Sequence, residues 1–165
     1  MIVLKTPEEI EMMAQASKIV AEAHLVLKEE VRPGITTLVL DKIADDFIRD
    51  HGGIPAFKGY RNYPNTLCVA VNDEVVHGIP SGRVLKEGDI IGLDLGAIVQ
   101  GFYGDGAVTV PVGRVSDQVS TLMRVTEEAM MKGIAKGVVG NRLSDISHVV
   151  QQHVETHGFS VVRDF

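Results

Sequence analysis

The sequence predicts an α+β protein in which helices pack on one face of a largely antiparallel sheet. Three observations support this: two helical patterns open the chain, short β-rich runs separated by turn residues occupy its middle, and two more helical patterns follow. Consecutive strands joined by tight turns pair antiparallel, and helices outside such a run pack onto the sheet. Because 165 residues are one domain's worth and no linker or repeat divides them, a single domain over residues 1–165 is expected.

The two N-terminal helices are predicted from their caps and their apolar spacing. Thr6 can cap the first helix, Pro7 suits its first position, and Glu9 completes a capping box. Apolar residues then recur with helical periodicity. The residues expected to end the first helix, to cap the second and to end the second are, in that order, Arg32-Pro33-Gly34, Thr37 and Gly52-Gly53.

The middle of the chain predicts strands and the last part predicts two helices and a strand. Gln100-Gly101 is a turn signal that joins the two longest strands into a hairpin. The helices that follow have apolar faces beginning at Val119 and Ile146, and Gly158 ends the second. The expected strands are Thr66–Val71, Val75–Val76, Ile90–Val99, Phe102–Val110 and a final one, Phe159–Val162.

Composition excludes several classes of protein. The net charge is −6 with no basic block, which argues against specific nucleic-acid binding. No apolar run reaches the roughly 18 residues of a membrane span, and the first residues lack the apolar core of a signal peptide. Cys68 is the only cysteine, which suits a reducing compartment. A cytoplasmic protein without a membrane partner is therefore expected.

Two acidic residues in the predicted hairpin are the most informative feature. With a two-residue loop at Gln100-Gly101, Asp94 faces Ala107 and Asp105 faces Gly96, so the two carboxylates are diagonal neighbours on one face. Both lie in apolar, glycine-rich strand sequence. Two carboxylates on a partly buried sheet repel each other unless one is protonated or a cation lies between them. Divalent metal binding is one interpretation.

A simpler interpretation stays open for the same pair. One of the two aspartates could lie at a strand end in solvent, and a bulge near Gly104 would turn Asp105 to the other face.

His77 is the second candidate. It follows an apolar run and precedes Gly78-Ile79-Pro80, so it is expected on a constrained loop beside the sheet. An imidazole there could hydrogen-bond a substrate amide or transfer a proton. The alternative is a solvated or capping histidine, which local sequence alone favours.

Three of the eight aromatic residues gather just before the first predicted strand: Phe57, Tyr60 and Tyr63. An aromatic loop over a sheet can line a pocket for an apolar side chain, with Cys68 on the next strand as its floor. A loop that folds its own rings into the core is an equally good interpretation.

His153 and His157 are four residues apart on a predicted helix, a spacing that can bind zinc. No third ligand lies near them in the sequence, so a solvated helix face is the expectation.

Taken together, the motifs resemble the type I methionine aminopeptidases over essentially the whole chain. Each motif is weak alone, but their order and the eleven-residue step from Asp94 to Asp105 make the match specific. The matching stretches are Lys5-Thr6-Pro7-Glu8-Glu9-Ile10, Arg32-Pro33-Gly34-Ile35-Thr36-Thr37, Gly59-Tyr60-Arg61-Asn62-Tyr63-Pro64, Asn72 through His77-Gly78-Ile79-Pro80, and Gly88-Asp89-Ile90 through Asp94 to Gly104-Asp105.

The resemblance implies a pita-bread fold, of which residues 1–165 would be the N-terminal portion of the catalytic domain. It implies a hydrolase that removes the initiator methionine from nascent peptides when the next residue is small. It also implies two divalent metal ions, Co²⁺, Mn²⁺, Fe²⁺ or Zn²⁺, bridged by a water or hydroxide that attacks the scissile carbonyl.

The same resemblance assigns roles to individual residues. Asp94 would bind one metal with both oxygens, Asp105 would bridge both metals, and His77 would contact the substrate near the scissile amide. The walls of the methionine pocket would be Phe57, Tyr60, Tyr63 and Cys68. The family often has Cys where this chain has Phe57, and a hydroxyl residue where Gly106 follows Asp105.

The family's remaining metal ligands, a His in a Gly-His-Gly segment and two Glu, lie beyond Phe165. The resemblance therefore predicts weak or partial metal binding and poor hydrolysis by this chain alone, with self-association through an exposed sheet edge. Two alternatives are a catalytically silent module that docks peptides or a ribosome, and a relative of the proline-specific dipeptidases or creatinases. The latter usually carry an extra N-terminal domain, for which the helix start at Thr6 leaves no room.

Overall fold

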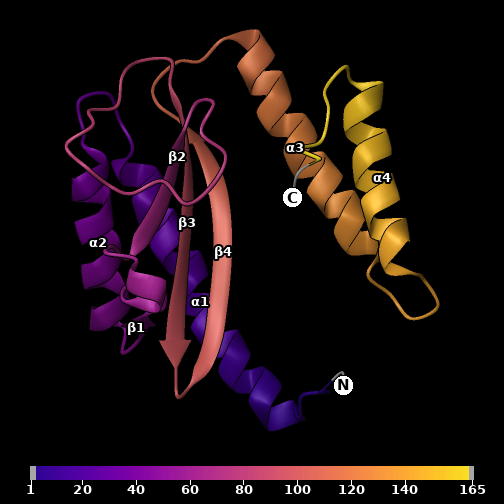
Figure 1. Cartoon of the computed structure of the whole chain (residues 1–165), viewed down its shortest axis with the longest axis horizontal. Helices are drawn as coiled ribbons and strands as arrows, with labels where there is room; N and C mark the ends of the chain where they lie inside the picture. Colours follow the sequence, from indigo (N-terminus) through magenta and orange to yellow (C-terminus); the bar gives the residue numbers. More distant parts are fainter. Residues whose placement is uncertain (1–2, 164–165) are drawn as a thin grey trace. The chain divides into compact units, whose positions relative to one another are not determined.

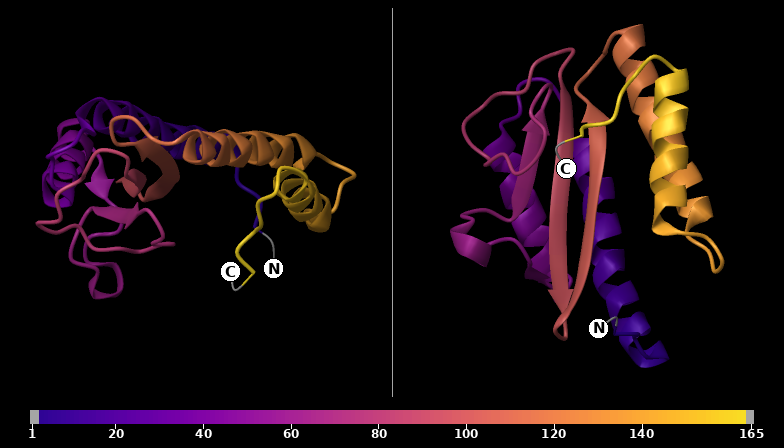
Figure 2. Two further views of the ribbon diagram at one scale, coloured as in Figure 1. Left: turned by 90° about the horizontal axis from the view of Figure 1, so that it is seen from above. Right: turned by 45° about the vertical axis from the view of Figure 1, so that its right-hand side comes forward.

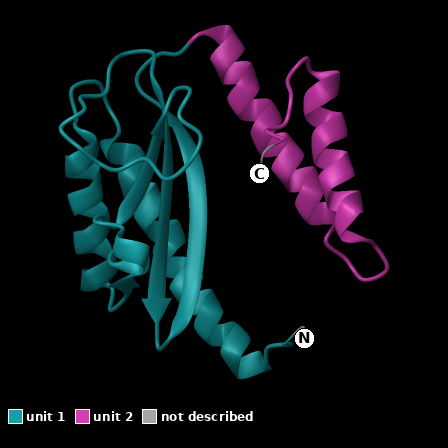
Figure 3. Ribbon diagram, viewed as in Figure 1, with its two compact units in different colours: residues 1–115 teal, residues 116–165 magenta. Residues whose placement is uncertain are grey.

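The computed structural model describes residues 3–163. The chain folds as two units, residues 1–115 and 116–165, which Figure 3 colours separately. The first unit holds helices α1 and α2 and strands β1 to β4, and the second holds helices α3 and α4. The predicted α+β class with an antiparallel sheet is confirmed. The assignment of residues 1–165 to one domain stays a prediction.

Helix α1 (Pro7–Glu30) starts as its sequence predicts, with a capping box between Thr6 and Glu9. Helix α2 (Thr37–Asp50) starts one residue earlier than expected, because Thr36 and not Thr37 is the cap: the Thr36 hydroxyl accepts from the Val39 amide at 3.3 Å. Thr37 is buried instead, and its hydroxyl donates to the Ser81 carbonyl at 3.0 Å. Thr37 therefore fastens α2 to the loop that precedes β3.

The sheet is built around one long hairpin. Strands β3 (Ile90–Val99) and β4 (Phe102–Pro111) pair along their whole length, and Val99 faces Phe102 across the turn. Gln100 and Gly101 have φ angles of 50° and 84°, as a type I′ turn requires. On the other edge of β3, strand β2 (Leu67–Val71) pairs with residues 91–95 and the short strand β1 (Ile54–Pro55) pairs with residues 97–98.

The two helices of the first unit cover one face of this sheet (Figures 1 and 2). Helix α1 packs on β3 and β4, and α2 packs on β1 and β2. Because side chains alternate along a strand, Leu93 and Leu95 of β3 point into the helix-covered core, whereas Asp94 and Gly96 belong to the opposite face. The core consists mainly of Leu27, Leu40, Ile48, Leu67, Leu85, Ile91, Leu93 and Leu95.

Glycine residues in β4 allow the backbone of α1 to pack directly against the backbone of the strand. A Cβ on Gly104 of β4 would overlap backbone atoms of Ala16 and Ser17, so only glycine fits there. A Cβ on Gly106 would lie 3.3 Å from Val20 Cγ1 and 3.6 Å from His24 Cε1. Both glycines face α1, which leaves Asp105 between them on the other side of the strand.

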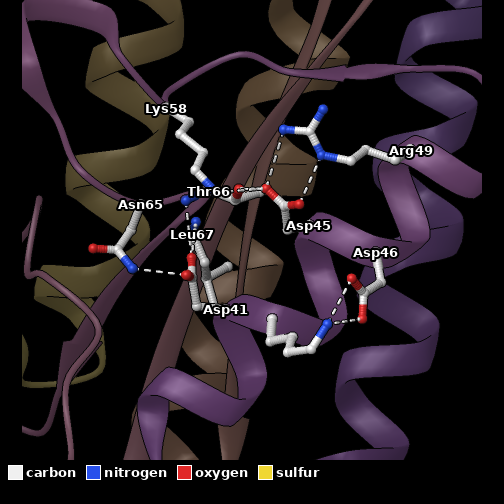
Figure 4. Close-up of polar contacts among 9 residues, drawn as sticks. Asp41, Asp45, Asp46, Arg49, Lys58, Asn65, Thr66 and Leu67 are labelled. Carbon is white, nitrogen blue, oxygen red and sulfur yellow. Dashed lines mark hydrogen bonds and ion pairs between the residues drawn. The ribbon is translucent and has the colours of Figure 1, made fainter.

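A polar network joins α2 to the start of β2 (Figure 4). The buried Asp41 carboxylate accepts from the amides of Thr66 and Leu67 at 2.9 and 2.8 Å and from the Asn65 side chain at 2.7 Å. One turn later, Asp45 accepts from Arg49, Lys58 and the Thr66 hydroxyl. Since Lys58 lies in the aromatic loop, the network fixes where that loop leaves and rejoins the sheet.

The second unit is a helical hairpin. Helix α3 (Asp117–Lys136) is capped by Ser116, and helix α4 (Leu143–Thr156) packs against it. Its core is small and consists of Val125, Ala129 and Val154, with Val150, Phe159 and Val161 packed against them. Among the helices formed by residues 3–163, none has the length and apolar character of a membrane span.

Two predicted strands are wrong and one strand was not predicted. Val75 and Val76 lie in an exposed loop, and residues 159–163 are irregular. A β-rich run forms a strand only where another strand offers hydrogen bonds, and neither run has one within residues 3–163. Strand β1 is only two residues long, too short for its pattern to show in the sequence.

Candidate functional site

The register of the hairpin brings the two predicted acids onto one face. Asp94 pairs with Ala107 and Asp105 pairs with Gly96, as the sequence predicts, and no bulge intervenes. The two aspartates are therefore diagonal neighbours on the face of the sheet opposite α1. Asp94 is half-buried and Asp105 is exposed, so this face is open to solvent at the acid pair.

The electrostatic environment of Asp94 favours a cation beside it. Burial raises the pKa of the Asp94 carboxyl, and the negative charge of Asp105 raises this pKa further, while His77 acts in the opposite direction. A positive ion at this face would offset both the burial and the repulsion. Two carboxylates with this relationship are a donor set that divalent metal ions accept.

Cys68 and Tyr63 continue the same face toward the edge of the sheet. Cys68 of β2 pairs directly with Asp94, so its thiol is on the face of the two acids. Burial raises the pKa of this thiol, and the charges of Asp94 and Asp105 add to that, against a hydrogen bond with Tyr63. Burial likewise raises the pKa of the Tyr63 phenol. Both groups are therefore neutral at physiological pH.

The aromatic loop reaches this face through Phe57. A Cβ on Gly96 would lie 2.9 Å from Cε1 of Phe57 and 3.0 Å from the Ala56 Cβ, so the phenyl ring lies over Gly96, beside the position of Asp105. Tyr60 lies instead on a short 3-10 helix, η1 (Tyr60–Asn62), with 64% of its surface exposed. The structure thus brings Phe57, Tyr63 and Cys68 to the acids, but not Tyr60.

His77 lies on a loop held against β2. Its φ angle is 60°, a left-handed conformation that few non-glycine residues adopt. The loop is fixed on its next residue, because the Val69 amide donates to the Gly78 carbonyl at 3.0 Å and the Tyr63 hydroxyl lies 2.9 Å from the same oxygen. His77 is exposed and is close enough to Asp94 to affect its pKa.

His24 of α1 is a buried titratable residue that sequence reasoning missed, and it lies on the helix-covered side of the sheet. Its Nε2 lies 3.2 Å from the Leu93 carbonyl, and burial lowers the pKa of the imidazole. The ring lies near Gly106, where a Cβ would make an ordinary contact of 3.6 Å with its Cε1. Only its place on the apolar face of α1 signalled that it would be buried.

The expectation for the histidine pair of α4 is wrong at His153. His153 is 8% exposed and His157 is exposed, and Glu128 of α3 lies beside them as a third possible ligand. Glu128 is 25 residues from His153 in the sequence, so only the packing of α3 on α4 reveals it.

Comparison with known proteins defines the family. The sequence model of metallopeptidase family M24 matches residues 11–165, so the chain belongs to this family. It is 52% identical to a methionine aminopeptidase of Clostridium perfringens, covering 100% of this chain and 66% of the relative. It is 51% identical to methionine aminopeptidase 1 of Bacillus subtilis, again over 66% of the relative. The chain thus spans just under two thirds of the length of these curated relatives.

Solved structures agree. The methionine aminopeptidase of Rickettsia prowazekii superposes with a TM-score of 0.96 at 38% identity, over 100% of this chain and 66% of that one. The methionine aminopeptidase of Thermotoga maritima superposes with a TM-score of 0.96 at 45% identity, over 100% of this chain and 67% of that one. A prolidase of Pyrococcus furiosus, at 21% identity and a TM-score of 0.84, shares the fold alone. The pita-bread fold class is therefore confirmed.

Proposed function

We propose that this chain carries part of the active site of a cytoplasmic methionine aminopeptidase. The substrate class is nascent peptide N-termini in which methionine precedes a small residue. The observation that carries the proposal is the acid pair, Asp94 and Asp105, on one open face of the sheet, in a chain about half identical to methionine aminopeptidases.

The acid pair would hold two divalent ions, with Asp94 on one of them and Asp105 between both. The donor set fits such ions, because its oxygens repel each other when no cation is present. Bound metal would polarise a peptide carbonyl and lower the pKa of a water molecule. The candidate ions are Mn²⁺, Fe²⁺, Co²⁺ and Zn²⁺, and metal analysis of the isolated enzyme would identify the one it holds.

The neighbouring side chains would bind the substrate. Phe57, Tyr63 and Cys68 surround the acid pair with one phenyl ring, one neutral phenol and one neutral thiol, an environment that suits a methionine side chain. Tyr60 is the remaining candidate wall, and it would have to move from its exposed position to join them. His77, on its fixed loop, is the candidate donor to the scissile amide.

We expect a polypeptide of residues 1–165 to bind these metals weakly and to hydrolyse methionyl peptides poorly by itself. Two carboxylates offer four oxygens at most, whereas two ions with four or more ligands each need about eight, so water would have to supply the rest. The outer edge of β4 pairs with no other strand within residues 3–163. Such an edge favours self-association, which light scattering would detect as a dimer. A ribosome is a further candidate partner.

A chimaera gives the sharpest test of the active-site proposal. Residues 1–165 would replace the aligned segment of the Clostridium perfringens methionine aminopeptidase, which is 52% identical to them. We expect the metal-loaded chimaera to release methionine from a Met-Ala-Ser peptide, because both parts of the site are then present. Asp105→Asn in the chimaera should abolish this release, since an amide oxygen is a poor bridge between two cations.

The intact Clostridium enzyme is the positive control for the chimaera. Asp73→Asn is the matched substitution at an exposed turn residue, and it should leave methionine release unchanged. A folded chimaera that releases no methionine would overturn the proposal, as would an active Asp105→Asn variant. A chimaera that binds methionyl peptides without cleaving them would instead favour a silent peptide-binding module.

A further inference from the structure

A second group of possible metal ligands lies in the helical hairpin formed by α3 and α4. Glu128 projects from α3, and His153 and His157 project from the C-terminal end of α4. One ligand atom from each residue can be chosen so that all three lie within 4.8 Å of one another. The two histidines are four residues apart, which places them on the same side of α4, facing Glu128.

The hydrogen-bond partners indicate which tautomer each neutral ring adopts. Lys132 Nζ lies 2.7 Å from His153 Nδ1, so an ammonium donates to that nitrogen and the proton of the neutral imidazole is on Nε2. This Nε2–H donates to Glu128 Oε2 at 2.9 Å. His157 donates from Nδ1 to the His153 carbonyl at 2.8 Å. Its Nε2 therefore carries a free lone pair and has no hydrogen-bond partner among the described residues.

Three features point to a cation at this position. A histidine that donates Nδ1–H to a backbone carbonyl presents Nε2 as a ligand, the arrangement that orients metal-bound histidines. Glu128 adds a carboxylate whose two oxygens accept from Arg124 Nη1 and His153 Nε2. His157 is the residue that ends α4, where the carbonyls of the last turn carry partial negative charge.

We propose that Glu128, His153 and His157 form a binding site for one Zn²⁺ ion, with water as the fourth ligand. The ion would replace the proton between His153 Nε2 and Glu128 and bind the free Nε2 of His157. Two histidines and one glutamate are a known ligand set for zinc, and its bonds of about 2.0–2.2 Å need the ligand atoms only about 3.4 Å apart. Binding would therefore need side-chain rotations that bring ligand atoms now within 4.8 Å of one another to this separation. This site does not depend on the proposed peptidase function.

Two positively charged side chains oppose the ion: Arg124, which is paired with Glu128, and Lys132, which lies against a ring nitrogen of His153. When His153 Nε2 binds zinc, the ring proton belongs on Nδ1, where the Lys132 ammonium now donates. Lys132 is exposed, so its side chain can move into solvent, but its positive charge still repels the ion. Lys132→Gln would remove this charge and offer an amide oxygen that accepts the Nδ1 proton. We therefore expect Lys132→Gln to bind zinc more tightly.

The test is a zinc titration of the untagged chain against a chromophoric chelator. Asp94→Asn and Asp105→Asn are introduced first, so that the acid pair of the first unit cannot bind zinc. The titration then reports on the site between α3 and α4 alone, whatever the outcome of the active-site proposal. In this background we expect one equivalent of Zn²⁺ to bind. His157→Ala and Glu128→Gln should each weaken this binding by at least about tenfold. Glu128→Gln keeps an oxygen for the His153 proton, which preserves the packing of the two helices.

His148→Ala is the matched control, because His148 is exposed on the same helix and is not part of the cluster. It should leave zinc affinity unchanged. Zinc should also shift the imidazole nuclear magnetic resonance signals of His153 and His157 and leave those of His148 in place. The proposal is overturned if the background variant binds no zinc, or if His157→Ala or Glu128→Gln binds it as tightly as the background does.

Discussion

Phe57 and Gly96 are in contact across the open face of the sheet, with the phenyl ring occupying the space that a side chain at position 96 would need. The contact joins the aromatic loop to the strand that carries Asp94. It also places an apolar surface next to Asp105, which pairs with Gly96. The Phe57 ring can therefore lie beside the acid pair only because residue 96 has no side chain.

Gly96→Ala tests this contact. The new Cβ would lie 2.9 Å from Phe57 Cε1 and 3.0 Å from Ala56 Cβ, so either the ring moves or the strand does. Overpacking of this kind costs about 1–3 kcal/mol, and we expect that loss in the free energy of unfolding measured with urea. Gly92→Ala is the control on the same strand and face, since its Cβ would make an ordinary 3.5 Å contact with Ala70. Equal stability of the two variants would contradict the contact.

Asp94→Asn should stabilise the metal-free chain at neutral pH. The folded pKa of Asp94 is raised, so the unfolded chain, with a pKa of about 3.9, loses its proton first. The free energy of unfolding therefore falls as pH rises above about 3.9, and this loss persists at pH 7. An amide cannot ionise and avoids the loss. Urea unfolding in EDTA at pH 4 and pH 7 measures it. The prediction fails if the variant is no more stable than its parent at pH 7.

Asp45 should make the opposite contribution. Hydrogen bonds from Arg49, Thr66 and Lys58 hold the pKa of this carboxyl well below its usual range. Its stabilisation is complete above the unfolded value of about 3.9 and is lost as pH falls below it. Asp45→Asn should therefore destabilise the chain at pH 7 and have less effect near pH 2. Asp46→Asn, in an exposed pair with Lys42, should show little effect at either pH. A pH-independent effect of Asp45→Asn would contradict this assignment.

Tyr63→Phe should loosen the loop that holds His77. The hydroxyl lies within 3.0 Å of the carbonyl oxygens of Leu67 and Gly78, and it donates its one proton between them. We expect a loss of about 1 kcal/mol in stability and faster amide hydrogen exchange at Val69, whose N–H is bonded to Gly78. Tyr103→Phe, on the exposed side of β4, is the control. Unchanged exchange at Val69 would show that Tyr63 does not hold the loop.

Local signals predicted the part of the site that a hairpin defines. The turn at Gln100-Gly101 fixes the register, and the register alone puts Asp94 and Asp105 on one face. The cap at Thr6 is predicted correctly because a cap is a contact within one turn, and the cap of α2 is wrong by one residue, at Thr36 instead of Thr37.

The features that the sequence does not predict depend on contacts between segments far apart in the chain. Val75 and Val76 have high β-propensity but no partner strand within residues 3–163, so they form a loop. The spacing of His153 and His157 was visible, but Glu128 joins them only through the rotation of α3 against α4. Phe57 lies beside the acids on a loop whose next residue, Lys58, forms an ion pair with Asp45 of α2.

The two-residue turn between β3 and β4 makes the pairing of the acids a matter of parity. In a hairpin closed by such a turn, residues on the two strands share a face only when an odd number separates their positions, and eleven separates Asp94 from Asp105. Deleting one residue between Gly96 and the turn would leave the fold's hydrogen bonds possible but send Asp105 into the helix layer. Insertions or deletions between the two aspartates therefore keep both acids on one face only when they add or remove an even number of residues.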